Sequence, residues 1–340
     1  MRPFEFIRAE TDRAALASIT AIPTDPGAGR GGTQYLAGGT TLIDLMKIDV
    51  MRPKRVIDIN SLSGDPYKRI LLDERGLRLG ALIRMADAAD HAGIKKAYPM
   101  LAQSLTFAAS QQLRNMASLG GNVLQRTRCT YFRDVSYAGC NKRDPGSGCA
   151  ALEGVNRAHA VLGTSNQCIA TYPGDFAQTL IALDARINLI GPNGPRAIAF
   201  ADLHRLPTDQ PHMETNLADG ELIAEFVVPA TPSAKRSVYL KIRDRASYEF
   251  ALASAAVALD LDRDTIRDAR IALGGVATVP WRAADAERTL TGKAVSDEAF
   301  AAAAEAAFVQ ARPSPHNAFK VALGKRTLIR ALHQASVMEI

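Results

Sequence analysis

The stretch YLAGGTTLIDLMK, residues 35–47, places a short strand, a Gly-Gly turn and an amphipathic helix directly after one another. Leu42, Leu45 and Met46 follow the i, i+3, i+4 spacing of one helix face. Glycines allow close approach of the backbone, and N–H groups of the turn and of the helix start can point at one anion. Residues 37–41 therefore predict a phosphate-binding turn, although a Gly-Gly pair alone is more often only a tight turn.

A second glycine turn lies in RNMASLGGNV, residues 114–123. Ser118 supplies a hydroxyl group, and Gly120, Gly121 and Asn122 follow it. Two such turns in one domain favour a ligand that contains a pyrophosphate.

A third glycine pattern is misleading. Gly27, Gly29 and Gly32 match G-x-G-x-x-G, but this motif binds dinucleotides only between a strand and a helix. Here a Pro-rich loop precedes the glycines and the strand TQYLAG follows them, so we expect a loop over residues 23–33.

The composition is that of a globular protein: 47% of the 340 residues are hydrophobic and 22% are charged. The net charge of +6 is spread along the chain without interleaved aromatic residues, which disfavours nucleic-acid binding. No apolar run reaches the length of a membrane span, so we expect no membrane insertion. The N-terminal MRPFEFIRAETDR shows no signal peptide.

The order of predicted elements indicates the fold class. Strands and helices do not alternate regularly, which favours an α+β fold over a doubly wound sheet. The segment PATPSAKR near residues 229–236 separates a long N-terminal region from a smaller C-terminal domain. Hydrophobic periodicity predicts helices over residues 97–116, 296–311 and 317–335, and strands over residues 54–59, 76–83, 220–229 and 250–261.

All the cysteines of the chain, Cys129, Cys140, Cys149 and Cys168, lie within one window of 40 residues. Their spacing lacks the short C-x2–4-C pairs of structural zinc sites and the C-x2-C-x2-C of two-cluster ferredoxins. A long loop can still supply four thiolates to a [4Fe–4S] cluster. Five basic side chains (Arg126, Arg128, Arg133, Lys142 and Arg143) against Asp134 and Asp144 would suit the negative charge of a cluster. Disulfides or unligated thiols remain alternatives, although a chain of this size does not need disulfides to fold.

Five strings occur in order along the chain: YLAGGTTLIDLMK, LGALIRMAD, LRNMASLGGNV, YPGDFAQTLIALDARINL and KIRDRASYEFALASAAVAL. Together they resemble the FAD-binding subunits of the molybdenum hydroxylases, the family of xanthine dehydrogenase, carbon monoxide dehydrogenase and aldehyde oxidoreductase. The resemblance covers nearly the whole chain. It departs at Ser118, where the family usually has Thr, and at ATYPGD, where the family often has ASPAGD with Asp175 still aligned.

The resemblance implies an α+β fold in which two subdomains of a PCMH-type FAD-binding domain, residues 1–229, enclose FAD. A CO dehydrogenase flavoprotein-like C-terminal domain, residues 236–340, follows. By motif, the implied FAD-binding residues are Ala37, Gly38, Gly39, Thr40, Thr41 and Leu42 around the pyrophosphate, Ser118, Gly121 and Asn122 from the second subdomain, Asp175 at a polar group of FAD, and Lys241 near the flavin ring. A cation near the ring would stabilise its reduced, anionic form.

The strings QRTRC, CNKR, PGSGCAALEG and CIAT resemble a subset of this family, typified by the flavin subunit of the periplasmic aldehyde oxidoreductase. In that subset a cysteine loop holds a [4Fe–4S] cluster. The resemblance therefore implies a cluster loop at about residues 126–170 with Cys129, Cys140, Cys149 and Cys168 as ligands.

The implied function is that of an electron-transfer subunit with no catalytic residue of its own. In the expected heterotrimer, a large partner with the molybdenum cofactor oxidises an aldehyde, and a small partner with [2Fe–2S] clusters passes electrons to FAD in this chain. An external acceptor then takes them. Alternatives are a stand-alone FAD-linked oxidoreductase, the flavin subunit of a xanthine or other heterocycle dehydrogenase, and a non-catalytic assembly module. We expect a periplasmic location through export with a signal-bearing partner, although the chain itself would permit the cytoplasm.

Overall fold

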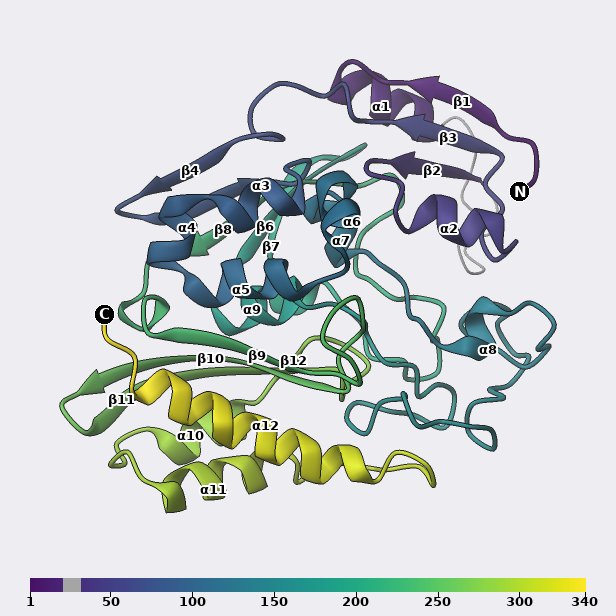
Figure 1. Ribbon diagram of the computed structural model, residues 1–340. Helices are drawn as coiled ribbons and strands as arrows, with labels where there is room; N and C mark the ends of the chain where they lie inside the picture. The colour runs from purple at the N-terminus through teal and green to yellow at the C-terminus, as the bar shows by residue number, and fades with distance from the viewer. Residues whose placement is uncertain (21–31) are drawn as a thin grey trace.

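The computed structural model describes residues 1–20 and 32–340, which form three layers stacked along the chain order (Figure 1). The first layer is a small parallel sheet in the order β1-β3-β2. Its elements are β1 (Glu5–Arg8), α1 (Asp12–Thr20), β2 (Thr33–Leu36), α2 (Leu42–Lys47) and β3 (Arg55–Asp58). The predicted strand and helix on either side of the first glycine turn are thus confirmed. Of the predicted loop 23–33, Gly27 and Gly29 lie outside the described residues.

The second layer is a five-stranded antiparallel sheet in the order β4-β5-β8-β6-β7. The strands are β4 (Ile70–Asp73), β5 (Gly76–Gly80), β6 (Arg186–Gly191), β7 (Gly194–Ala199) and β8 (Leu222–Pro229). The helices are α3 (Met85–Asp90), α4 (Ala92–Ala97), α5 (Pro99–Phe107), α6 (Gln111–Met116), α7 (Leu119–Val123), α9 (Phe176–Ala182) and the 3-10 turn η1 (Phe200–Asp202). Leu77, Leu79 and Phe226 from the sheet share one core with Leu101 of α5 and Phe176 of α9.

The single helix predicted over residues 97–116 is wrong. The structure has two helices, α5 and α6, with a break at residues 108–110. Ala109 adopts φ 48°, a left-handed conformation that no α-helix contains. The side chain of Ser110 then caps α6 by accepting a hydrogen bond from the Leu113 N–H at 3.3 Å. Apolar periodicity continues across the break, which explains why the sequence pattern did not detect it.

The third layer is a four-stranded antiparallel sheet in the order β12-β11-β10-β9. Its elements are η2 (Pro232–Ala234), β9 (Ser237–Ile242), β10 (Ala253–Asp262), β11 (Thr265–Gly274), β12 (Trp281–Arg282), α10 (Ala284–Leu290), α11 (Asp297–Ala307) and α12 (Phe319–Ser336). Helices α10, α11 and α12 cover its outer face (Figure 1). From β9 and β10, Tyr239, Ala256 and Ala258 instead join the core of the second layer. The two layers therefore share apolar packing, and the α+β class is confirmed.

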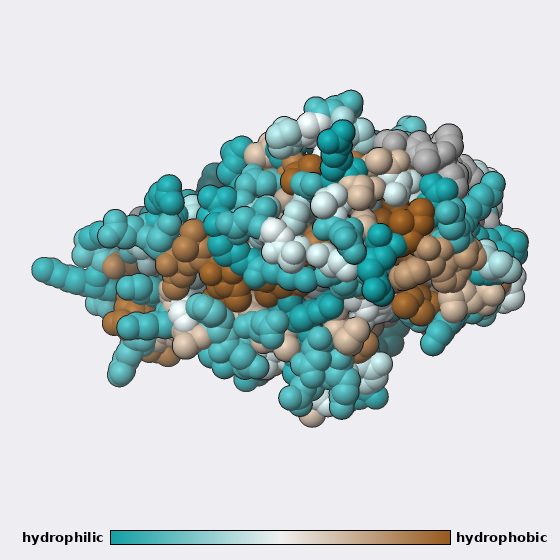
Figure 2. All heavy atoms as spheres, turned by 90° about the horizontal axis from the view of Figure 1, so that it is seen from above, coloured by the Kyte–Doolittle hydropathy of each residue, from teal (hydrophilic) through white to brown (hydrophobic). Residues whose placement is uncertain are grey.

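The cysteine-containing segment is almost free of regular structure and lies at one side of the layers, near α8 (Thr130–Arg133) in Figure 1. In the view of Figure 2, polar and charged side chains cover most of the surface, and hydrophobic side chains form separate groups. Within the described residues, no helix combines the length and the apolar character needed to cross a bilayer.

Candidate functional site

The two glycine turns that the sequence analysis singled out pack directly against each other. A Cβ atom on Gly38 would lie only 2.0 Å from the carbonyl oxygen of Met116 and 2.9 Å from Cα of Ala117. Only glycine therefore allows the two backbones to come this close. The next residue, Gly39, has φ 75°, a conformation that side chains rarely adopt. The first turn thus reaches the start of the second through backbone contact.

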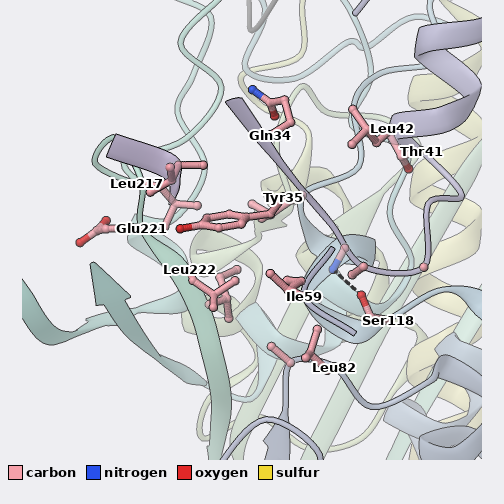
Figure 3. A pocket seen from close by; sticks show the side chains of 18 of the residues that line it. Gln34, Tyr35, Thr41, Leu42, Ile59, Leu82, Ser118, Leu217, Glu221 and Leu222 are labelled. Carbon is pink, nitrogen blue, oxygen red and sulfur yellow. Dashed lines mark hydrogen bonds between the residues drawn. The ribbon is translucent and has the colours of Figure 1, made fainter. Parts of the chain in front are cut away.

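The second turn is held in place by its own hydrogen bonds. Ser118 caps α7, its hydroxyl oxygen accepting a hydrogen bond from the Gly121 N–H at 3.1 Å, drawn as the dashed line in Figure 3. The N–H groups of Leu119 and Gly120 donate to the carbonyl oxygens of Ile83 and Ala81 at 2.9 and 2.8 Å. The hydroxyl group that the sequence predicted as a cofactor contact therefore also shapes the turn.

Both turns line one cavity of about 340 Å³ (Figure 3). This volume lies in the usual range for small-molecule sites, about 300–1,000 Å³. Eight predicted cofactor residues line it together: Ala37, Gly38, Gly39, Thr40, Thr41, Leu42, Ser118 and Gly121.

The far wall of this cavity was missed by the sequence analysis. Tyr35 extends across the cavity toward Leu217 and Leu222 in Figure 3. Its hydroxyl group donates a hydrogen bond to the carbonyl oxygen of Gly220 at 3.0 Å. Gly220 itself has φ 80° in the Asp-Gly turn before β8. That turn was the available sequence signal, because the wall is built by a segment about 180 residues beyond the first turn.

The chemistry of the lining fits a ligand with a phosphate end and an apolar ring. Thr40 and Thr41 carry hydroxyl donors. Arg126 adds a cation to the lining. Ile59 and Leu82, together with the tyrosine ring, supply apolar surface. FAD combines both kinds of group, so these residues fit it.

Three predicted FAD contacts, Asn122, Asp175 and Lys241, do not line this cavity. The Asn122 amide donates to the sulfur of Met85 at 3.4 Å, and its buried oxygen has no hydrogen-bond partner among the described residues. Asp175 and Lys241 form a buried ion pair with each other. Their contact with FAD stays a prediction.

The four cysteines, which are up to 39 positions apart, all line one small cavity. Cys140 and Cys149 face each other across a short antiparallel bridge. The turn between them contains Gly146 and Gly148, both with positive φ (84° and 92°), as their predicted turn role requires. Cys168 reaches the same cavity from the far end of the segment. The structure thus brings together every predicted cysteine ligand.

None of these cysteines forms a disulfide. Burial raises the pKa of Cys129 to about 12 and that of Cys168 to about 11. Without a metal these two thiols are therefore protonated and inert, whereas a bound metal would deprotonate them. In the part of the chain that is described, no three His, Cys, Asp or Glu side chains stand close enough to hold a single metal ion. Four thiols around one cavity are a donor set that either a zinc ion or a [4Fe–4S] cluster can use.

The basic side chains of the cysteine segment do not form a free positive surplus, which corrects one sequence-based argument. Arg128 and Arg133 pair with Asp44 of α2, the helix after the first glycine turn. Arg126 and Lys142 pair with Glu214. These pairs fasten the segment to the FAD-binding domain, because the acidic partners come from outside it.

The fifth of these basic side chains, Arg143, is also used structurally. Its guanidinium donates to the carbonyl oxygens of Tyr131, Phe132 and Asp134 at 2.6, 3.0 and 3.1 Å, and to that of Tyr137. These bonds fold the backbone around α8 and so fix the position of the neighbouring Cys129.

Comparison with known proteins identifies the family. Residues 2–231 match the family described as FAD binding domain in molybdopterin dehydrogenase, and residues 238–335 match the CO dehydrogenase flavoprotein C-terminal domain. The chain is 44% identical to the aldehyde oxidoreductase FAD-binding subunit PaoB of Escherichia coli, over 98% of this chain and 99% of PaoB. It is 28% identical to the glyceraldehyde dehydrogenase medium chain of Sulfolobus acidocaldarius, over 87% of this chain and 83% of that one.

A solved structure has the same fold along the full length. It is carbon monoxide dehydrogenase from Hydrogenophaga pseudoflava, with a TM-score of 0.74 and 26% identity over 99% of both chains. Domain matches, relatives and fold agree, and the chain belongs to the family of FAD-binding subunits of the molybdopterin-dependent dehydrogenases.

Proposed function

We propose that this chain is the FAD- and [4Fe–4S]-containing electron-transfer subunit of a heterotrimeric molybdenum aldehyde oxidoreductase. Its similarity to an aldehyde oxidoreductase FAD-binding subunit over nearly the whole of both chains supports the assignment to aldehyde oxidation. A second relative is named as a glyceraldehyde dehydrogenase chain, and its substrate is also an aldehyde.

The convergence of Cys129, Cys140, Cys149 and Cys168 on one cavity is the observation that carries the cluster. A cubane cluster of this type is held by four thiolates. The loop that presents them is fastened to the FAD-binding domain by two acidic residues, Asp44 and Glu214. The chain would therefore hold its two cofactors in one rigid unit.

When bound, FAD and the cluster supply electron transfer, FAD linking carriers of one electron to acceptors of two. The chain's own residues would bind and orient these two cofactors. Residues 37–42 with Ser118, Gly120 and Gly121 would surround one end of the FAD site, and Tyr35 would close the opposite wall through its hydrogen bond to Gly220. A large partner would supply the molybdenum cofactor, a small partner would supply [2Fe–2S] clusters, and an external acceptor would remove the electrons. We further propose that the complex is exported to the periplasm with a signal-bearing partner.

The test is anaerobic purification of the chain with the proteins that accompany it. Two partner chains, molybdenum, one FAD and about four iron atoms beyond those of the small partner are expected, since the cluster holds four irons. Cys129→Ser should lose most of that extra iron and keep FAD. Val155→Ser is the matched control, because Val155 is 71% exposed in the same segment.

Absence of FAD, or of both partner chains, would contradict the subunit assignment. Wild-type protein with no extra iron and four titratable thiols would contradict the cluster alone. Oxidation of a heterocycle but of no aldehyde would contradict the substrate class. Cell fractionation tests the location, and recovery of the complex only in the cytoplasm would contradict export.

A further inference from the structure

The imidazole ring of His159 lies directly against one of the four cysteines. Its Nε2 atom is 3.1 Å from Sγ of Cys129. The histidine is only 5% exposed, so water hardly competes for this contact. The pattern-based search for the cysteine site considered only cysteines as ligands and therefore did not include His159.

The backbone that carries this ring is fixed from the C-terminal domain. The carbonyl oxygen of His159 accepts hydrogen bonds from Nζ of Lys320 at 3.1 Å and from Nδ2 of Asn317 at 3.3 Å. Lys320 is fully buried and also donates to the carbonyl oxygens of Ala158 and Gly275 at 3.0 and 2.7 Å. The His159 N–H donates to the carbonyl oxygen of Asn156 at 3.0 Å. The ring therefore stays beside the sulfur with little freedom to move away.

The direction of the contact follows from the chemistry of a metal-bound cysteine. A thiolate carries no hydrogen and can only accept, so the shared hydrogen must belong to Nε2. The other ring nitrogen, Nδ1, is buried and has no hydrogen-bond partner among the described residues. The geometry thus favours the tautomer with its hydrogen on Nε2.

We infer that His159 is a positioning residue for the cluster, and that its Nε2–H donates a hydrogen bond to the Cys129 sulfur that raises the reduction potential of the cluster. The inference rests on the proposed cluster. A hydrogen bond to sulfur offsets part of the negative charge of the cluster, and this stabilises the reduced form more than the oxidised form because reduction adds a negative charge. Burial strengthens the effect, because the local dielectric constant is low.

The test compares two substitutions in the intact complex. His159→Phe keeps a flat ring and removes the donor, whereas His159→Gln keeps an N–H at the position of Nε2. The readout is the midpoint potential of the [4Fe–4S] cluster from a redox titration followed by electron spin resonance. We expect about a tenfold shift toward the oxidised form in His159→Phe, or about 59 mV for a one-electron couple. His159→Gln should stay close to wild type.

His204→Phe is the matched control, since His204 is another histidine, with a half-buried ring whose Nε2 bonds to the carbonyl oxygen of Val123 at 2.9 Å. Its cluster potential should equal that of wild type. An unchanged potential in His159→Phe with full iron content would overturn the inference, as would a His159→Gln potential as low as that of His159→Phe. If His159→Phe loses its iron, His159→Gln still tests the inference. This variant must then keep both its iron content and the wild-type midpoint potential, and the loss of either would overturn the inference. A wild-type protein without extra iron would instead refute the proposed cluster itself.

Discussion

Nζ of Lys241 lies 2.8 Å from Oδ2 of Asp175, in an ion pair whose side chains are only 2% and 5% exposed. Tyr239 donates a hydrogen bond from its hydroxyl group to the other carboxylate oxygen at 2.6 Å. The lysine also donates to the carbonyl oxygen of Phe107 at 3.1 Å. Asp175 precedes α9 of the second layer and Lys241 belongs to β9 of the third. The pair therefore joins the two layers at the position where the family resemblance places the flavin.

Lys241→Met should lower the free energy of unfolding by about 3–5 kcal/mol, because it leaves the Asp175 carboxylate buried without its counter-charge. Denaturant unfolding at neutral pH measures the loss. The double variant Asp175→Asn/Lys241→Met should lose less than the sum of the single losses, since both changes remove the same interaction.

Lys95→Met is the surface control for this pair. Lys95 pairs with Asp90 at 3.0 Å, but the two side chains are 52% and 81% exposed. Its loss should therefore stay below about 1 kcal/mol. Equal losses for Lys241→Met and Lys95→Met would mean that the buried pair does not hold the layers together.

Gly38→Ala should lower FAD content at least tenfold in protein that still folds. The added Cβ would lie 2.0 Å from the Met116 carbonyl oxygen and would push the two glycine turns apart. FAD per chain, measured from the flavin released on denaturation, reports the effect. Gly64→Ala is the control, because a Cβ there would meet no atom within 4 Å. Full FAD content in folded Gly38→Ala protein would show that the contact between the turns does not shape the site.

Local patterns predicted those parts of the site that depend on neighbours in sequence. The periodicity of Leu42, Leu45 and Met46 identified α2, and the paired glycines identified both turns. The contact between the turns could not be predicted, because nothing near Gly38 in the sequence encodes the position of Met116. The same limit explains why Tyr35 was missed, since its partner lies 185 residues away.

Charge counting failed for a related reason. The basic residues of the cysteine segment looked like counter-charges for a cluster, but Asp44 and Glu214, which pair with four of them, lie far outside the segment. Likewise, Lys241 and Asp175 were assigned separate roles from their motifs. Only the fold shows that each is the other's partner.

Glu214 should stabilise the protein through its pairs with Arg126 and Lys142. Burial alone would raise the pKa of this carboxyl, but the two cations lower it from 4.5 to about 2. Because the pKa is lower in the folded state, the contribution to stability is complete above pH 4.5 and is lost as the pH falls from there toward 2. At about 1.4 kcal/mol for each pKa unit, it is on the order of 3 kcal/mol.

Denaturant unfolding of wild type and Glu214→Gln between pH 7 and pH 3 measures this contribution. The difference between the two proteins should be constant down to about pH 4.5, where the ordinary glutamate pKa lies, and should then shrink. Glu305→Gln, whose pair with Lys325 is on the surface, should show no comparable difference. A difference for Glu214→Gln that does not change with pH would mean that the carboxylate charge is not what stabilises the loop.

Lys320 should give a pH dependence of the same sense, but in the alkaline range. Burial, together with the positive charge of nearby Arg157, lowers the pKa of its ammonium group from 10.5 to about 7. Between these two pH values the unfolded chain binds more protons than the folded one, so stability rises with pH across this window. The rise is on the order of 4 kcal/mol. Denaturant unfolding from pH 7 to pH 10 should show the rise in wild type and lack it in Lys320→Met. Lys325→Met, on the same helix, should keep the wild-type slope, whereas a slope retained in Lys320→Met would trace the rise to another group.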